Sequence, residues 1–187
     1  QRMSRGLGDV YKRQAVLAKS CSTSSDKKQV PVLETSKKIK VVSTWISGID
    51  ANKEAIRILS SNGSAITAVE KGLNVTESDP NNTSVGFGGM PDARGVVTLD
   101  ASIMDDQYNC GSVTYLQNIE HPISVARKVM EETPHVMLSG KGAYDFAIEQ
   151  GFTHKNLLTE SSLQKWQEWK KGNSFNLPHI NHENHDT

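Results

Sequence analysis

The chain has 187 residues, of which 36% are hydrophobic and 14 are glycine, enough for one globular domain with its own core. Its 21 basic and 21 acidic residues cancel, which argues against nucleic acid as a partner, because nucleic-acid-binding chains carry a basic excess. No run of about 18 apolar residues occurs, so the sequence predicts no complete transmembrane helix. Cys21 and Cys110 are too few for a disulfide framework.

The amino-terminal region divides into two segments of unusual composition. Residues 1–14 lack helical or strand periodicity and are similar to translated sequencing-adaptor read-through, so we expect a non-native leader rather than a genuine basic arm. Residues 15–38 are interpreted as a signal-peptide remnant or a disordered tail. Small residues stand shortly before Cys21, as in a lipoprotein signal, which suggests a periplasmic location or a lipid anchor at Cys21.

Residues 39–171 carry the periodic patterns of one layered α/β or α+β domain. Asp50 and Ser64 offer N-caps for two successive helices, and Pro122 suits the first turn of a later one. The elements expected in chain order are a buried strand at 39–45, helices at 51–61 and from 65, strands at 96–104 and 112–115, a helix at 122–132, a strand at 135–138, and helices at 142–150 and 160–171.

Two motifs outside these elements have competing interpretations. The glycine-rich segment 86–89 is expected to form a tight structural turn, because a phosphate loop would lead into a helix and this one leads into a strand. The other is a histidine-rich segment beside Pro178, which favours a solvated polar linker over a metal site. Its potential ligands are His179, His182, Glu183, His185 and Asp186.

The last residues suggest chemistry at a peptide bond. An Asp186-Thr187 bond after a polar linker suits self-cleavage, because a threonine hydroxyl can attack the preceding carbonyl. The new amino-terminal threonine could then use its own α-amine as the general base for its hydroxyl. By pattern alone the triplet could equally be an arbitrary end point. Trp45, after an apolar run, fits a core aromatic or a pocket wall equally well.

Several ordered stretches together resemble the glycosylasparaginases, or aspartylglucosaminidases, of the N-terminal nucleophile hydrolase superfamily. Each stretch alone would be weak, but their order along residues 39–187 makes the resemblance specific. The stretches are VSTW at 42–45, AVEKG at 68–72, SVGFGG at 84–89, VTLDA at 97–101, PISVAR at 122–127, TPHVML at 133–138, NLLT at 156–159 and HDT at 185–187.

The resemblance implies an α+β fold, a four-layer αββα sandwich of which only the amino-terminal part is present. Residues 39–171 would belong to the α chain and residues 172–187 would lead to the cleavage site. Cleavage between Asp186 and Thr187 would make Thr187 the nucleophile, with Asp186 assisting the cleavage. Trp45 would line the substrate pocket and Ser84 would lie near it. Family members need no metal or organic cofactor and are commonly dimers of αβ units.

The implied reaction is hydrolysis of the amide that joins N-acetylglucosamine to asparagine, releasing aspartate. In the family the oxyanion donors and the groups that bind the aspartate moiety follow the threonine, in the β chain, so the fragment by itself is expected to be inactive. Many members carry an aromatic residue where Ile46-Ser47 stand here, and this departure bears on self-cleavage. A second departure is Cys110, where an apolar residue is common.

Three other readings remain open. The first is an L-asparaginase or isoaspartyl peptidase of the same superfamily. Those enzymes typically open with a His-Gly-Gly-type turn, and residues 44–48 read TWISG instead. The second is a non-catalytic structural remnant without its β chain, and the third is a metal-binding domain with a polar tail.

Overall fold

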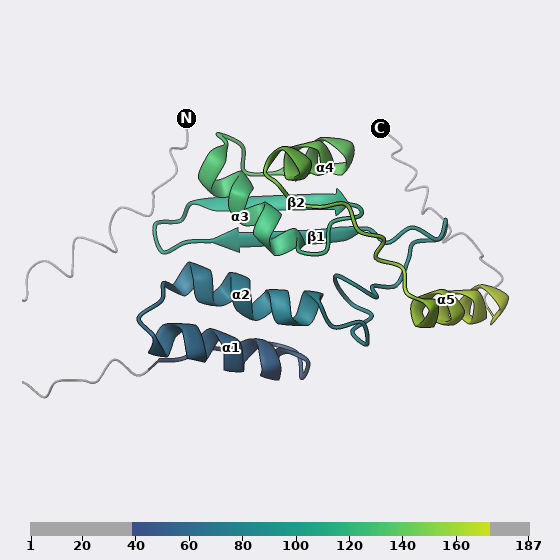
Figure 1. Cartoon of the computed structure of the whole chain (residues 1–187), viewed down its shortest axis with the longest axis horizontal. Coiled ribbons are helices and arrows are strands. Elements are labelled where there is room, and N and C mark those ends of the chain that lie inside the picture. The colour runs from purple at the N-terminus through teal and green to yellow at the C-terminus, as the bar shows by residue number, and fades with distance from the viewer. Residues whose placement is uncertain (1–38, 173–187) are drawn as a thin grey trace, which may run out of the picture. The chain divides into compact units, whose positions relative to one another are not determined.

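The structure, a computed structural model, describes residues 39–172, all within the second of the two units into which the chain divides, Ile39–Thr187. These residues form an α+β arrangement of five helices and one three-stranded sheet, and α1 and α2 lie side by side (Figure 1). The elements are α1 Gly48–Ser60, α2 Ala65–Glu77, β1 Leu99–Met104, β2 Cys110–Leu116, α3 Pro122–Glu132, β3 Leu138–Ser139, α4 Gly140–Glu149 and α5 Glu160–Gly172. No helix among them is long and apolar enough to cross a membrane.

Local chemistry explains where the helices begin. α2 follows Ser64, whose hydroxyl oxygen accepts a hydrogen bond from the Thr67 backbone N–H at 3.2 Å, so the predicted N-cap is confirmed. α3 begins at Pro122, as predicted, because its fixed φ suits the first helical position. α1 begins earlier than predicted, at Gly48. Asp50 therefore lies in the first turn, where its charge complements the helix dipole, and is not the N-cap.

The predicted strand at 39–45 is wrong. The segment runs as irregular backbone into α1, and Val42 and Trp45 are 89% and 80% exposed. A strand needs a hydrogen-bonded neighbour, and none of the strands within residues 39–172 pairs with this segment. The apolar, β-branched residues at 39–45 favour a strand, but the described part of the chain provides no strand that pairs with them.

The sheet has the order β1-β2-β3, with β1 and β2 antiparallel and β2 and β3 parallel. The turn between β1 and β2 is held by Asp105, whose carboxylate accepts hydrogen bonds from the backbone N–H groups of Gln107 and Asn109 at 2.8 and 2.9 Å. Tyr108 adopts a left-handed φ of 66° in this turn. The turn lies where the sequence predicted it.

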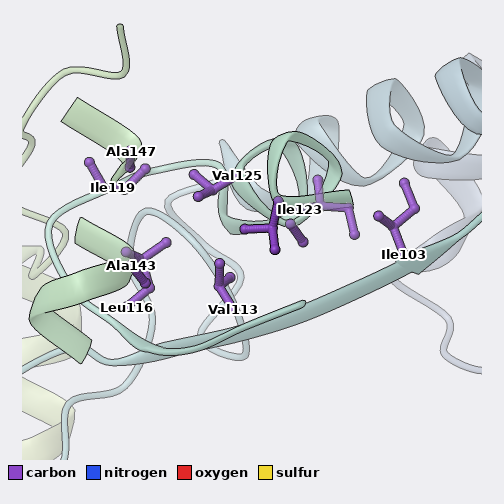
Figure 2. Packing of buried hydrophobic residues seen from close by; sticks show 10 residues of the cluster. Ile103, Val113, Leu116, Ile119, Ile123, Val125, Ala143 and Ala147 are labelled. Carbon is purple, nitrogen blue, oxygen red and sulfur yellow. The ribbon is translucent and has the colours of Figure 1, made fainter. Parts of the chain in front are cut away.

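The main hydrophobic core lies between one face of the sheet and helices α3 and α4. Figure 2 shows side chains from the strands and from α3 pointing toward one another. β2 approaches α3 closely because Gly111 has no side chain, and a Cβ there would lie 2.2 Å from the Ala126 carbonyl oxygen. The buried members are Ile103, Val113, Leu116, Ile119, Ile123, Val125, Ala126, Val129, Ala143 and Ala147.

Candidate functional site

A cavity of about 600 Å³ lies between the segment that precedes α1, the two helices α1 and α2, and the loop after α2. Its helical walls are close together because Gly72 faces the α1 backbone, and a Cβ at Gly72 would lie 2.7 Å from the Ala51 carbonyl oxygen. Ala55 and Ala68, which line the cavity, form a small buried cluster with Ile58. Small residues on α1 and α2 therefore let the two helices pack closely and leave room for the cavity beside them.

Trp45 stands at the entrance to α1 and lines this cavity. Its carbonyl oxygen accepts a hydrogen bond from the Gly48 N–H at 2.9 Å, at the first turn of the helix. The Ser43 hydroxyl donates to the Asn52 side-chain oxygen, which ties the irregular segment to α1. Gly48 is required here, since a Cβ would lie 2.3 Å from the Ser43 Cβ. Trp45 is thus presented by a defined turn while its indole stays exposed.

Ser84 lines the same cavity from the loop that follows α2. Its backbone N–H donates to the Asn82 side-chain oxygen at 2.9 Å, and the Asn82 N–H donates to the Asp79 carbonyl at 3.0 Å. These local side-chain and backbone bonds give the loop its turn without regular secondary structure. The structure therefore brings together Trp45 and Ser84, the two site residues predicted within its described part.

The glycine-rich turn confirms the structural interpretation of residues 86–89. Gly86 has a φ of +65°, and a Cβ there would lie 2.0 Å from the Glu77 carbonyl oxygen. Gly88 has a φ of +99°, and a Cβ there would lie 2.6 Å from the Pro80 carbonyl oxygen. Glycine is needed at both positions for conformation and for space. Phe87 donates its N–H to the Glu77 carbonyl at 2.7 Å, which closes the loop on the end of α2.

No ionisable side chain is found among the described residues that line the cavity. The walls supply apolar surface, hydroxyl groups and the amides of Asn52 and Asn82, and none of these groups can act as a strong base near neutral pH. Sequence reasoning missed Asn82, although the Asn-x-Ser spacing is typical of an asparagine that binds the backbone N–H two residues on. Proton transfer in this cavity requires a group from elsewhere.

The opposite side of α2 carries a polar network that the sequence did not reveal. Glu70 is 8% exposed, and it accepts hydrogen bonds from the Ser124 hydroxyl at 2.6 Å and the Arg127 guanidinium at 2.8 Å. Burial raises the pKa of Glu70, but the bonds from Ser124 and Arg127 and the charges of Lys71 and Arg127 outweigh it, so the pKa is lowered overall. The network fastens α2, which forms one cavity wall, to α3.

The same two helices are joined again at Glu77, which is 4% exposed. Its carboxylate accepts the Ile123 backbone N–H at 3.1 Å and lies 3.1 Å from His121 Nδ1. His121 itself provides no side-chain cap for α3. A residue from the end of α2 therefore caps the first turn of α3, where negative charge is favourable.

The other predicted site residues lie outside the described part of the chain: Asp186, Thr187 and the histidine-rich segment near them, as well as Cys21. Within residues 39–172, no group of three or more His, Cys, Asp or Glu side chains gathers closely enough to hold a metal ion. Of the predicted site, the described residues thus contain Trp45 and Ser84 in the walls of one cavity.

The sequence matches the asparaginase family over residues 27–185. It is 54% identical over 82% of its length to the N(4)-(β-N-acetylglucosaminyl)-L-asparaginase of Elizabethkingia miricola and 43% identical over 71% to that of Rattus norvegicus. It is also 37% identical over 64% to a rat isoaspartyl peptidase/L-asparaginase. It spans 45%, 39% and 37% of these three proteins, less than half of each. With this match along most of its length, the chain belongs to the asparaginase family.

Proposed function

We propose that the protein containing this chain hydrolyses the amide of N4-(β-N-acetylglucosaminyl)-L-asparagine and releases aspartate. One structural observation supports this most: Trp45 and Ser84, from separate parts of the sequence, line one cavity. The Elizabethkingia miricola and Rattus norvegicus relatives are both named N(4)-(β-N-acetylglucosaminyl)-L-asparaginase, and this name supplies the substrate class. The uncharged cavity walls fit a reaction whose base comes from the nucleophile itself.

In the proposed mechanism Thr187 is the nucleophile. Its hydroxyl attacks the side-chain amide carbon of the substrate while its free α-amine takes the proton. The C–N bond breaks as that proton passes to the departing glycosylamine, which leaves an aspartyl ester on Thr187. Water then attacks the ester carbon and releases aspartate, and the hydroxyl is restored. Each hydrogen-bond donor to the oxyanion contributes about 3 kcal/mol to such a reaction.

Within this mechanism the residues of the cavity wall orient the substrate. The exposed indole of Trp45 offers an apolar face beside the reacting amide, and the Ser84 hydroxyl offers a hydrogen bond. The substrate also carries a free α-carboxylate and a free α-amine, whose recognition calls for an arginine and an acidic group. Because no charged residue is found among the described cavity walls, we assign these contacts and the oxyanion donors to other parts of the protein.

Activation of Thr187 requires cleavage of the bond before it. We propose that the Thr187 hydroxyl attacks the Asp186 carbonyl carbon and that the C–N bond breaks as the nitrogen takes up the hydroxyl proton, which gives an ester and frees the α-amine. Water then opens the ester, which frees the Thr187 hydroxyl and leaves a carboxyl group on Asp186. Asp186 assists this rearrangement. Residues 39–171 would then belong to the α chain of a four-layer αββα sandwich, and residues 172–187 to the linker.

The test uses the protein expressed from the complete reading frame that contains this chain. We expect it to split at Thr187, by mass spectrometry, and to release aspartate from glycosyl-asparagine. Thr187→Ala should abolish both events, and Thr187→Ser should retain both at reduced rates because it keeps a hydroxyl. Aspartate release by the Thr187→Ala variant would overturn the proposal.

A second candidate is an L-asparaginase or isoaspartyl peptidase activity, which the printed name of the more distant rat relative favours. Glycosyl-asparagine, L-asparagine and a β-aspartyl dipeptide are compared as substrates of the same preparation. We expect the glycosylated substrate to give the largest kcat/KM. Turnover of the dipeptide with glycosyl-asparagine untouched would establish the second candidate instead.

Three further expectations complete the proposal. The 187-residue chain by itself should release no aspartate, because the charged substrate contacts are assigned elsewhere. The whole protein should run as a dimer of αβ units in size-exclusion chromatography with light scattering. Mass spectrometry of the native amino terminus should find a lipid on Cys21, which would place the protein at a membrane or in the periplasm.

A further inference from the structure

Helix α5 contacts the loop between α2 and β1, residues 78–98, which carries Ser84. Ser162, in the first turn of α5, is completely buried, although serine is seldom found fully inside a protein. Its hydroxyl donates a short hydrogen bond to the Gly88 carbonyl oxygen. The Gly88 N–H donates in turn to the Leu157 carbonyl at 2.8 Å. The backbone N–H and the carbonyl oxygen of Gly88 are thus both hydrogen-bonded, one to Leu157 just before α5 and the other to Ser162 in its first turn.

A second attachment lies one turn further along α5. The Trp166 indole N–H donates to the Asp92 carbonyl oxygen at 2.9 Å. The indole ring lies against Gly95, where a Cβ would be 3.4 Å from the ring. Gly95 has a φ of +88°, so the turn that receives the ring has a backbone shape that favours glycine. Trp166 therefore combines a polar contact and a close apolar contact with the far end of the same loop.

These attachments are connected to Ser84 by a short path. The Met90 N–H, two residues after the held Gly88, donates to the Thr83 carbonyl at 2.9 Å. Thr83 directly precedes Ser84 in the turn that lines the cavity. An apolar cluster of Val97, Leu99, Leu157 and Leu158 packs where the segment before α5 meets the chain leading into β1. The loop is thus fixed from the end of α2 at one side and from α5 at the other.

We propose that α5 acts as a clamp that positions the Ser84 loop at the cavity, with Ser162 and Trp166 as its positioning residues. Neither residue lines the cavity, and each acts by holding a backbone carbonyl of the loop. Because Gly88 and Asp92 take part through carbonyl oxygens, the sequence of the loop does not reveal the contact. The consequence for catalysis rests on the proposed function, whereas the clamp itself can be tested without it.

Hydrogen exchange, followed by mass spectrometry on the protein from the complete reading frame, tests the clamp directly. Ser162→Ala removes one hydroxyl, and Trp166→Phe removes the indole N–H while keeping an aromatic ring against Gly95. In both variants we expect peptides covering 83–92 to exchange at least tenfold faster, with α1 unchanged. Ser64→Ala is the matched control for Ser162→Ala, because each removes one hydroxyl that makes two hydrogen bonds, and Ser64 lies outside the clamp. Unchanged exchange in both clamp variants, or equal acceleration in the control, would refute the proposal.

The activity measurement asks whether the clamp matters for the site. We expect Ser162→Ala and Trp166→Phe to lower kcat/KM for glycosyl-asparagine at least fivefold at a temperature where all variants are folded. The kcat/KM of Ser64→Ala should stay within twofold of the unaltered protein, even if its melting temperature falls as much as that of the other two variants. If kcat/KM falls in proportion to melting temperature in all three variants, Ser162 and Trp166 stabilise the fold and do not position the loop. If the unaltered protein leaves glycosyl-asparagine intact, the proposed function fails, and hydrogen exchange still decides the clamp.

Discussion

Two glycines illustrate how the same substitution should have opposite effects in this fold. At Gly111 a Cβ would lie 2.2 Å from the Ala126 carbonyl, whereas at Gly142 in α4 nothing lies within 4 Å. We expect Gly111→Ala to lower the free energy of unfolding by about 2 kcal/mol or more, because β2 and α3 must separate. Gly142→Ala should raise it by about 0.5 kcal/mol, because alanine restricts the unfolded chain and favours helix. Urea unfolding of the purified chain measures both, and changes of the same sign would contradict the packing described here.

Glu70 should make stability depend on acidity. Its pKa is lowered in the folded state below the ordinary value of 4.5, so the folded protein holds fewer protons on this group than the unfolded chain does. Its contribution is therefore complete above about pH 5 and declines as the pH falls through the folded pKa. We expect Glu70→Gln to cost about 1–2 kcal/mol at neutral pH, since it loses the charge opposite Arg127.

The difference between the unaltered chain and Glu70→Gln, measured by urea unfolding, should narrow below pH 4.5 as the native carboxylate takes up its proton. Glu132→Gln is the control, because its pair with Lys128 is largely solvent-exposed and should contribute less than about 0.5 kcal/mol. A difference for Glu70→Gln that stays constant from pH 7 to pH 3 would show that its charge is not responsible.

At the scale of elements, α2 and α3 depend on each other through Glu77. Its carboxylate supplies the acceptor that the first turn of α3 lacks. Glu77→Ala leaves the buried Ile123 N–H without this partner, and we expect a loss of about 2 kcal/mol. Glu77→Gln keeps an acceptor oxygen and should lose less. Both are measured by urea unfolding, with hydrogen exchange at the start of α3 as the local readout. Equal stability of the two variants would mean that the cap is unimportant.

Sequence patterns predicted those elements that are completed locally. The helix at Pro122, the Ser64 cap and the turn at Asp105 depend on residues a few positions apart, and the structure confirms them. The strand at 39–45 was wrong because a strand is completed by a partner that its own sequence does not specify. The network around Glu70 was missed for a similar reason, since Ser124 and Arg127 come from a distant helix.

At the scale of the whole molecule, the structure adds surroundings to the two predicted site residues that it describes. Trp45 and Ser84 were inferred from stretches that resemble a family, and both line the cavity. The hold of Ser162 and Trp166 on the loop could not be foreseen, because their partners are backbone carbonyls and carry no sequence signal. Contacts to backbone carbonyls such as these can be identified only from the folded structure.

Trp45 also offers a measure of how the described residues are completed in the whole protein. Its side chain is 80% exposed here, beside the exposed Val42 and Ile46, and burying one such aromatic contributes about 2–3 kcal/mol. If the proposed αββα sandwich covers this segment, acrylamide should quench Trp45 fluorescence severalfold less in the protein from the complete reading frame than in the 187-residue chain. Subtracting the signal of each Trp45→Phe variant isolates this residue.

The same subtraction with Trp166→Phe is the control, because the Trp166 indole N–H already has its partner within the described residues and its quenching should not change. Equal quenching of Trp45 in both proteins would mean that the segment at 39–46 stays uncovered. The sandwich would then be wrong for this part of the chain, and the apolar run would need a different partner. Protection of Trp45 alone would instead show that another part of the complete protein covers this side of the cavity, which Ser84 also lines.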